Sequence, residues 1–201
     1  KKDYHQNIAY DTFKPKLKTT PKKVIFLTWE ELNRLKDYQI PKDKQYLERV
    51  RDVFLFCCFT SLRYSDVRNL KRSDVKSDHI EVTTVKTADS LSIELNKYSK
   101  AILEKYKDIH FENHMALPVI SNQKMNDYLK EIAAICGIEK NLTYHVARHS
   151  CATSVLLSNG VPIETVSKIL GHTNIRTTQI YARITDLKVS NDMEMLAQKL
   201  D

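Results

Sequence analysis

Residues 144–181 read YHVARHSCATSVLLSNGVPIETVSKILGHTNIRTTQIY. Apolar residues recur along this stretch at helical spacing, which predicts one helix over residues 144–159 and a second beginning at Pro162. Gly160 and Gly171 follow the two helices, and glycine is favoured just past a helix end, as proline is at the first helical position. The stretch therefore predicts two helices followed by a short turn.

Four side chains in this stretch carry reactive groups: His145, Arg148, His172 and Tyr181. Together they supply what is needed to attack a phosphodiester without a metal, because a phenol can act as the nucleophile while fixed positive charge stabilises the transition state. The unperturbed pKa of a phenol is about 10, so attack near neutral pH requires a proton acceptor. His145 is the expected acceptor.

The same histidines have an alternative use as metal ligands. His145 and His149 lie four residues apart on one helical face, and His172 would be a third ligand. The residues between the first two are VAR, without the glutamate of the H-E-x-x-H zinc motif, and Arg148 would place a positive charge beside the cation. We therefore expect no metal site.

Two helices are predicted further upstream. Residues 28–31, TWEE, form a capping box that begins the first, and from about Lys44 a buried apolar stripe marks the second. This second helix leads into TSLRYSDVRNL at residues 60–70, where Ser65 is expected to cap a short helix. Arg63 would then lie in the turn between two helices, where its guanidinium can point into a cleft.

A β-hairpin is predicted next, because two short alternating runs at residues 79–85 and 91–95 flank the segment KTADS. Lys86 would lie at its tip. A lysine at a hairpin tip is usually only solvated, but its flexible side chain can also lay one ammonium against a phosphate.

Helices dominate the remainder of the chain, at about residues 96–109 and 121–136, with a last helix at about 186–200 whose single apolar stripe needs a partner surface. All three glycines follow predicted helix ends, so none remains for a phosphate-cradling loop or a dinucleotide fingerprint. The expected fold class is α+β, mainly α-helical with a small antiparallel β-hairpin.

Composition suits a globular protein with a polyanionic partner. The 201 residues include 32 Lys and Arg against 25 Asp and Glu, giving a net charge of +7. Residues 1–26 are rich in lysine and read as a basic arm or interdomain linker, which leaves residues 27–201 for the folded domain. Since the sequence begins at Lys1, we expect it to be a fragment that lacks a preceding domain.

Apolar runs and cysteine positions indicate the cellular location and the redox state of the thiols. No run approaches the roughly 20 apolar residues of a membrane span, and the basic start lacks the apolar segment of a signal peptide. We therefore expect a cytoplasmic, nucleoid-associated protein without a membrane partner. The cysteines lie within apolar helical patterns and read as reduced, buried thiols rather than a disulfide frame or metal site; they are Cys57, Cys58, Cys136 and Cys151.

Three motifs in this order resemble the catalytic domain of the tyrosine recombinases, the phage-integrase-type enzymes that break and join DNA. TSLRYSDVRNL resembles the family's first-arginine box, YHVARHS its H-x-x-R box and LGHTNIRTTQIYARI its histidine and nucleophile box. The resemblance extends from about Leu27 to the C-terminus. It implies a tyrosine recombinase catalytic-domain-like fold, and a site-specific recombinase or integrase as the function.

The resemblance also implies a role for each matching residue. Tyr181 would attack the scissile phosphate to form a 3′-phosphotyrosyl link. Arg63 and Arg148 would hold the non-bridging oxygens of that phosphate, and His172 would donate a further hydrogen bond. His145 would assist proton removal, and Lys86 would protonate the leaving 5′ oxygen. Asp66 matches a common acidic position of the family, which would orient the arginine or a histidine. No metal or nucleotide cofactor is implied, because the covalent link conserves the bond energy.

Two departures from the family pattern stand out. Ser61 occupies a position that is often glycine, and KTADS lacks the glycine frequent after the hairpin lysine, which makes Lys86 the least secure of the catalytic residues. Surface cations are expected to add salt-dependent contacts to phosphates; they are Lys71, Arg72 and Arg176.

The implied partner is double-stranded DNA, with four protomers assembled on two duplexes in the full-length protein. The C-terminal helix would dock on a neighbouring protomer, and delivery of Tyr181 in cis or in trans stays open. We expect the fragment alone to bind DNA weakly, as is compatible with a monomeric fragment. Two alternatives share the fold: a type IB topoisomerase-like swivel, and a catalytically silent DNA-binding regulator.

Overall fold

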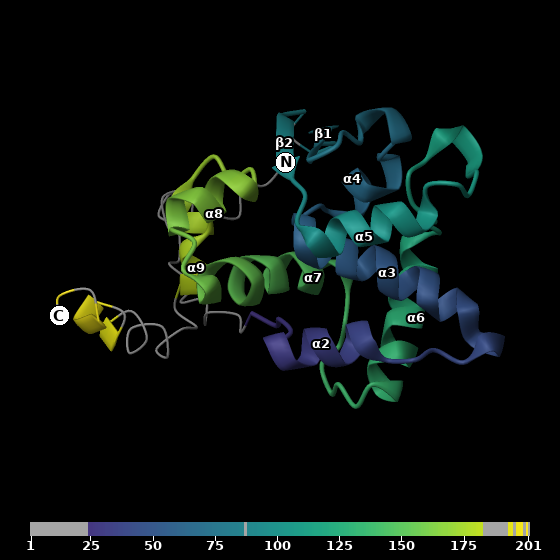
Figure 1. The fold of residues 1–201 in the computed structure, drawn as a ribbon, viewed down its shortest axis with the longest axis horizontal. Coiled ribbons are helices and arrows are strands. Elements are labelled where there is room, and N and C mark those ends of the chain that lie inside the picture. The colour runs from purple at the N-terminus through teal and green to yellow at the C-terminus, as the bar shows by residue number, and fades with distance from the viewer. Residues whose placement is uncertain (1–23, 87, 183–192, 195, 199, 201) are drawn as a thin grey trace, which may run out of the picture.

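A computed structural model describes residues 24–86, 88–182, 193–194, 196–198 and 200. One long helix, α3, lies at the centre, and α2, α4, α5, α6 and α7 pack against it (Figure 1). The helices and strands are α2 (Trp29–Asp37), α3 (Gln45–Thr60), α4 (Tyr64–Asn69), β1 (His79–Thr83), β2 (Ser90–Glu94), α5 (Lys97–Tyr106), α6 (Asn122–Ile135), α7 (Tyr144–Ser150), α8 (Ile163–Ile169) and α9 (Gln179–Ala182). The expected fold class is confirmed.

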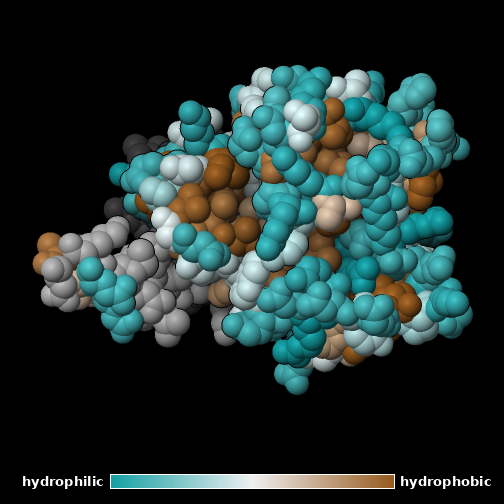
Figure 2. Space-filling model, in the orientation of Figure 1, coloured by the Kyte–Doolittle hydropathy of each residue, from teal (hydrophilic) through white to brown (hydrophobic). Residues whose placement is uncertain are grey.

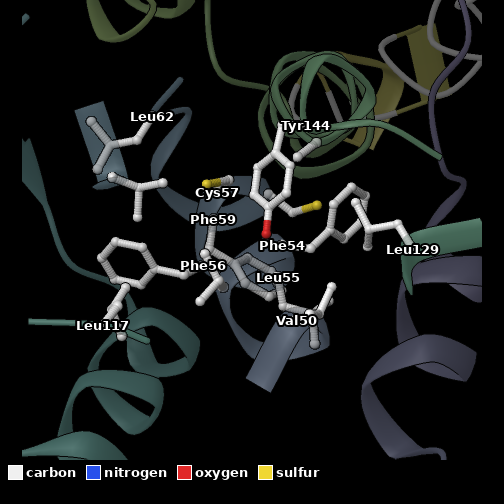
Figure 3. Packing of buried hydrophobic residues seen from close by; sticks show 14 of the residues in the cluster. Val50, Phe54, Leu55, Phe56, Cys57, Phe59, Leu62, Leu117, Leu129 and Tyr144 are labelled. Atoms are coloured by element: carbon white, nitrogen blue, oxygen red, sulfur yellow. The ribbon is translucent and has the colours of Figure 1, made fainter. Parts of the chain in front are cut away.

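Helix α3 is buried on almost every side, since an unbroken run from Asp52 to Thr60 has little exposed surface. Figure 3 shows its side chains meeting Leu117, Leu129 and Tyr144 from three other parts of the chain. Burying side chains of this size contributes about 1.5–3 kcal/mol each before the cost of ordering the chain. The helix is therefore the support on which the loops at its C-terminal end are fixed.

Local hydrogen bonds set the ends of the elements. Thr28 and Glu31 form the expected capping box of α2, with the Thr28 hydroxyl accepting from the Glu31 N–H and the Glu31 carboxylate accepting from the Thr28 N–H. Just before it, the N–H of Leu27 donates to Ser150 Oγ at 2.8 Å. The start of α2 is thereby tied to the end of α7.

The hairpin forms as an antiparallel pair in which Glu81 lies opposite Ser92. The first strand is two residues shorter than expected, the second is shifted by one residue, and they join through a turn that contains Lys86. Ile80 and Ile93 face each other on the buried side and pack on the main core. The turn is thus carried by a two-stranded sheet that is anchored on one face only.

The predicted helix over 144–159 is helical throughout but not regular. After α7 the chain forms a π turn over Cys151–Leu156 and a 3-10 turn over Leu157–Asn159 before Gly160, which has a φ of 82°. A π turn contains more residues than an α turn, so the side chains that follow it are rotated relative to those of α7. Ala152 and Leu157 consequently enter a second, smaller apolar cluster with α8 and α9.

One predicted helix start was wrong. The residue that precedes α4 is Arg63, and its carbonyl accepts from the N–H groups of Asp66 and Val67. Ser65 lies inside the first turn instead of capping it, and its hydroxyl donates to the Asp66 carboxylate at 3.3 Å. The short polar side chain is used to hold Asp66 rather than the helix end.

Some expectations fall outside the described residues. The structure does not describe residues 1–23, which contain most of the predicted basic arm. It also does not describe residues 183–192, where the last predicted helix begins. The described residues near the C-terminus, 193–194, 196–198 and 200, are helical, and Met193, Leu196 and Leu200 are exposed there. All four cysteines are buried free thiols, as expected. None of the described helices has the length and apolarity to cross a membrane.

Two neighbouring tyrosines of the core differ in one hydrogen bond. The rings of Tyr64 and Tyr144 meet edge to face at 5.5 Å, and the Tyr64 hydroxyl donates to the Ile120 carbonyl at 2.6 Å. The Tyr144 hydroxyl lies among apolar side chains (Figure 3) and has no hydrogen-bond partner in the described part of the chain. A buried hydroxyl without a partner destabilises the folded state.

We predict opposite effects of removing these hydroxyls. Tyr144→Phe should raise the free energy of unfolding by about 1 kcal/mol, because it removes an unpaired buried polar group, whereas Tyr64→Phe should lower it by about 1 kcal/mol by removing a hydrogen bond. Urea denaturation followed by circular dichroism measures both. A loss of stability in Tyr144→Phe as large as that in Tyr64→Phe would contradict the assignment.

Candidate active site

The site is built where α3 ends. Ser61 closes α3 in the left-handed conformation, with φ of 62°, a region that favours glycine. Its hydroxyl donates to the Ile169 carbonyl at 3.2 Å, which compensates for part of the backbone strain. The chain therefore reverses at this serine and presents Arg63 at the start of α4.

Asp66 connects Arg63 to the hairpin. This carboxylate is buried, lies 3.7 Å from the Arg63 guanidinium, and accepts the Val85 N–H at 3.0 Å. A charge-assisted bond to a backbone N–H is stronger than a neutral one and fixes direction as well as distance. Asp66 thus holds the base of the turn that carries Lys86, the residue after Val85.

Arg148 lies in α7 and is buried among backbone carbonyls. Its guanidinium donates to the Ser61 carbonyl at 2.8 Å and to the Leu170 carbonyl. Burial, with a smaller contribution from Arg63, lowers the pKa of Arg148 to about 10. The group therefore stays positively charged at neutral pH and joins three segments that are distant in the sequence.

Four of the expected catalytic residues line one pocket of about 360 Å³: Arg63, Lys86, His145 and Arg148. They come from the start of α4, the hairpin turn and α7. The lining also includes the polar side chains of Asn122, Asn126 and Thr143. Burial lowers the pKa of His145, and the charges of Arg148, Arg63 and Lys86 lower it further. The pocket therefore gathers three cations around an imidazole that is neutral at pH 7.

Tyr181 lies beside this pocket rather than in its wall. It is 3% exposed and packs in the second apolar cluster with Val166 and Leu170. Burial raises the pKa of its phenol, while the charge of Arg148 acts in the opposite direction. In this arrangement the nucleophile expected from the sequence is protonated and shielded, within the electrostatic reach of Arg148.

The partner of the phenol is His149. Its Nδ1 lies 2.8 Å from the Tyr181 hydroxyl oxygen, and its ring meets the His145 ring edge to face at 4.3 Å. Burial lowers the pKa of His149 to about 4, so the neutral ring can accept a hydrogen bond from the phenol. The proton-accepting role expected for His145 stays a prediction, and His149 lies in direct contact with the phenol.

His172 follows Gly171, whose φ is 59°, and is held from both sides. Its backbone N–H donates to the Ser167 carbonyl at 3.0 Å, and its Nδ1 lies 2.8 Å from Thr178 Oγ1. Burial lowers its pKa to about 4, with further lowering by Arg148 and Arg63. The sequence pattern singled out neither Thr178 nor the contact between His149 and Tyr181.

The three surface cations expected to touch phosphate have different surroundings. Arg72 donates from its guanidinium to the carbonyls of Tyr106, Lys107 and Ile109, so it closes the end of α5. Lys71 and Arg176 are exposed. Their binding of phosphate stays a prediction. No three His, Cys, Asp or Glu side chains form a group that could hold a metal within the described ranges.

The sequence matches a known protein family and several of its curated members. The profile of the Phage integrase family matches residues 26–188. Tyrosine recombinase XerD of Listeria monocytogenes serotype 4b (strain F2365) is 35% identical over 147 residues, which cover 66% of this chain and 49% of that protein. Tyrosine recombinase XerA of Thermococcus kodakarensis is 32% identical over 187 residues, covering 87% of this chain and 64% of that protein. The chain thus spans only part of the length of these relatives.

Solved structures agree in fold. The crystal structure of XerA recombinase has a TM-score of 0.67 at 26% identity, over 87% of this chain and 65% of that chain. The lambda integrase catalytic core, at 19% identity and a TM-score of 0.59, covers 74% of this chain and 91% of that one and shows likeness of fold alone. Together with the family profile, these matches establish that the chain belongs to the phage integrase family of tyrosine recombinases.

Proposed function

We propose that this chain is the catalytic domain of a site-specific DNA recombinase or integrase that cleaves and rejoins double-stranded DNA through a 3′-phosphotyrosyl link. The observation that carries the proposal is the convergence of Arg63, Lys86, His145 and Arg148 on one pocket, beside Tyr181 and His172. Solved relatives include lambda integrase bound to a core DNA site and a transposon integrase bound to circular intermediate DNA.

The charges of the pocket suit a phosphoryl transition state. Negative charge grows on the non-bridging oxygens as the phenol attacks, and cations fixed before the reaction stabilise it without reorganising. Arg148 is held by two backbone carbonyls, and Arg63 is oriented by Asp66. Both guanidinium groups are thus held in place before a substrate binds.

The proposed step conserves atoms and charge. The Tyr181 oxygen forms a bond to phosphorus as the bond from phosphorus to the 5′ oxygen breaks. The phenol proton passes to an imidazole, with His149 in contact and His145 next to it, and the Lys86 ammonium protonates the 5′ oxygen. No metal or nucleotide cofactor is required, because rejoining reverses the same step.

Delivery of the nucleophile requires a change in the position of α9. A phenol that is 3% exposed and packed beside Leu170 cannot reach phosphorus in a bound duplex. We propose that DNA binding, with a neighbouring protomer, draws α9 out of its cluster. The exposed residues Met193, Leu196 and Leu200 would pack on that neighbour in a tetramer on two duplexes.

A library of nicked duplexes with randomised arms tests the function without a known target site. The wild-type chain should form an adduct with DNA that survives detergent, and Tyr181→Phe should form none, because phenylalanine lacks the attacking oxygen. Sequencing the trapped DNA identifies the site.

Tyr64 also lines the pocket, so Tyr64→Phe is the matched control and should keep the adduct. An adduct that survives Tyr181→Phe but disappears in Tyr64→Phe would contradict the proposal. DNA binding without any adduct would indicate a regulator, and relaxation of supercoiled DNA without pairing of sites would indicate a swivel.

The role of Lys86 can be separated from DNA binding. Lys86→Ala should slow cleavage of normal DNA on the order of 10²-fold, because the 5′ oxygen loses its proton donor. A substrate with sulfur at the bridging 5′ position should be cleaved by the variant at nearly the wild-type rate, since a thiolate leaves without protonation. Lys100→Ala, which removes an exposed lysine outside the pocket, is the control. Equal slowing on both substrates would mean that Lys86 does not act as the acid.

A further inference from the structure

The contact between His172 and Thr178 goes beyond what the family motif assigns. Thr178 is completely buried, and its Oγ1 lies 2.8 Å from Nδ1 of the histidine. The two residues are six positions apart, on either side of the 3-10 turn Ile175–Thr177. A buried hydroxyl destabilises the fold unless it is paired, so the histidine is also the partner that the threonine requires.

The contact matters because His172 is neutral near pH 7. Its pKa is lowered to about 4, first by burial and then by the charges of Arg148 and Arg63. A neutral imidazole carries one N–H, and the hydrogen bond at one ring nitrogen decides which nitrogen holds the proton. A histidine that is to donate to a phosphate oxygen through Nε2 must therefore keep Nδ1 unprotonated.

We propose that Thr178 is a positioning residue whose hydroxyl donates to Nδ1 of His172 and keeps the N–H on Nε2, directed at the phosphate of the substrate. The proposal rests on the proposed function. It explains why a fully buried position at the end of the 3-10 turn carries a hydroxyl.

The backbone of the same residue holds the segment that carries the nucleophile. The Thr178 N–H donates to the Ile175 carbonyl at 2.8 Å, and its carbonyl accepts the Tyr181 N–H at 3.0 Å. The backbone of His172 is fixed separately by its bond to Ser167. With both backbones held, the Thr178 side chain needs only one rotamer to maintain the ring orientation of His172.

Two substitutions separate the hydroxyl from the volume of the side chain. Thr178→Val keeps the shape and removes the donor, and should slow formation of the covalent adduct about 10-fold, the loss expected for one hydrogen bond of about 1.4 kcal/mol. Thr178→Ser keeps the donor and should restore most of the rate. Affinity for DNA should stay within about twofold in both. A serine variant as slow as the valine variant would overturn the proposal.

A double-mutant cycle tests whether Thr178 acts through the histidine. In a His172→Gln background, Thr178→Val should cause no further slowing, because the ring that it orients is absent. A further 10-fold loss in that background would mean that Thr178 acts through Tyr181 instead, and would overturn the proposal.

Nitrogen-15 NMR of the imidazole gives a readout that is independent of catalysis. At pH 7 the shifts of His172 should show a proton on Nε2 in the wild-type chain and a mixture of tautomers in Thr178→Val. The tautomer of His172 can be measured even if no adduct forms. Absence of the adduct would refute the proposed function, whereas the NMR shifts test the positioning role separately. Unchanged shifts in the valine variant would overturn the positioning role by themselves.

Discussion

The arrangement of the site depends on one buried guanidinium. Arg148 bonds to the carbonyl of Ser61 at the end of α3 and to that of Leu170 at the end of α8. These are two helix ends whose last carbonyls have no partner within their own helix, and a cation is favoured there by the helix dipole. The same side chain that is proposed to bind phosphate thus also joins the two apolar clusters of the protein.

Burial is the main cause of the shifted protonation states around this cation, and its charge modifies them. The charge contributes to the lowered pKa of His145, His149 and His172, and it acts against the burial that raises the pKa of Tyr181. The three imidazoles are therefore neutral at pH 7, and each must find a specific hydrogen-bond partner for its single N–H. The contacts of His149 with Tyr181 and of His172 with Thr178 supply such partners.

Much of the fold was predictable, because its signals are local. The apolar stripe of α3, the capping box at Thr28 and the glycine at position 160 each act within a few residues, and the structure has all three. The gathering of Arg63 and Arg148 in one pocket was anticipated only through the likeness to a family. Spacing along the chain contains no information about a distance between α4 and α7.

The contacts that were missed have a common physical origin. The meeting of His149 with Tyr181 joins residues 32 positions apart, and the π turn that lies between them has no distinct apolar period in the sequence. Arg72 was expected at a phosphate because it is a cation beside a motif, and that stays a prediction; its bonds to carbonyls at the end of α5 were not anticipated. Only tertiary packing decides which polar groups are left for a surface arginine to bind.

The position of Tyr181 in the second apolar cluster links reactivity to local stability. That cluster is small, and among the described residues the phenol is one of its five buried members. Withdrawing the side chain exposes apolar surface of α8, a side of the molecule where apolar atoms already reach the surface (Figure 2). If Tyr181 is the nucleophile, as proposed, a local opening equilibrium sets the fraction of molecules in which the phenol is free to react. Under the proposed function, burial of the Tyr181 phenol in an isolated chain would delay cleavage until a complex on DNA has assembled.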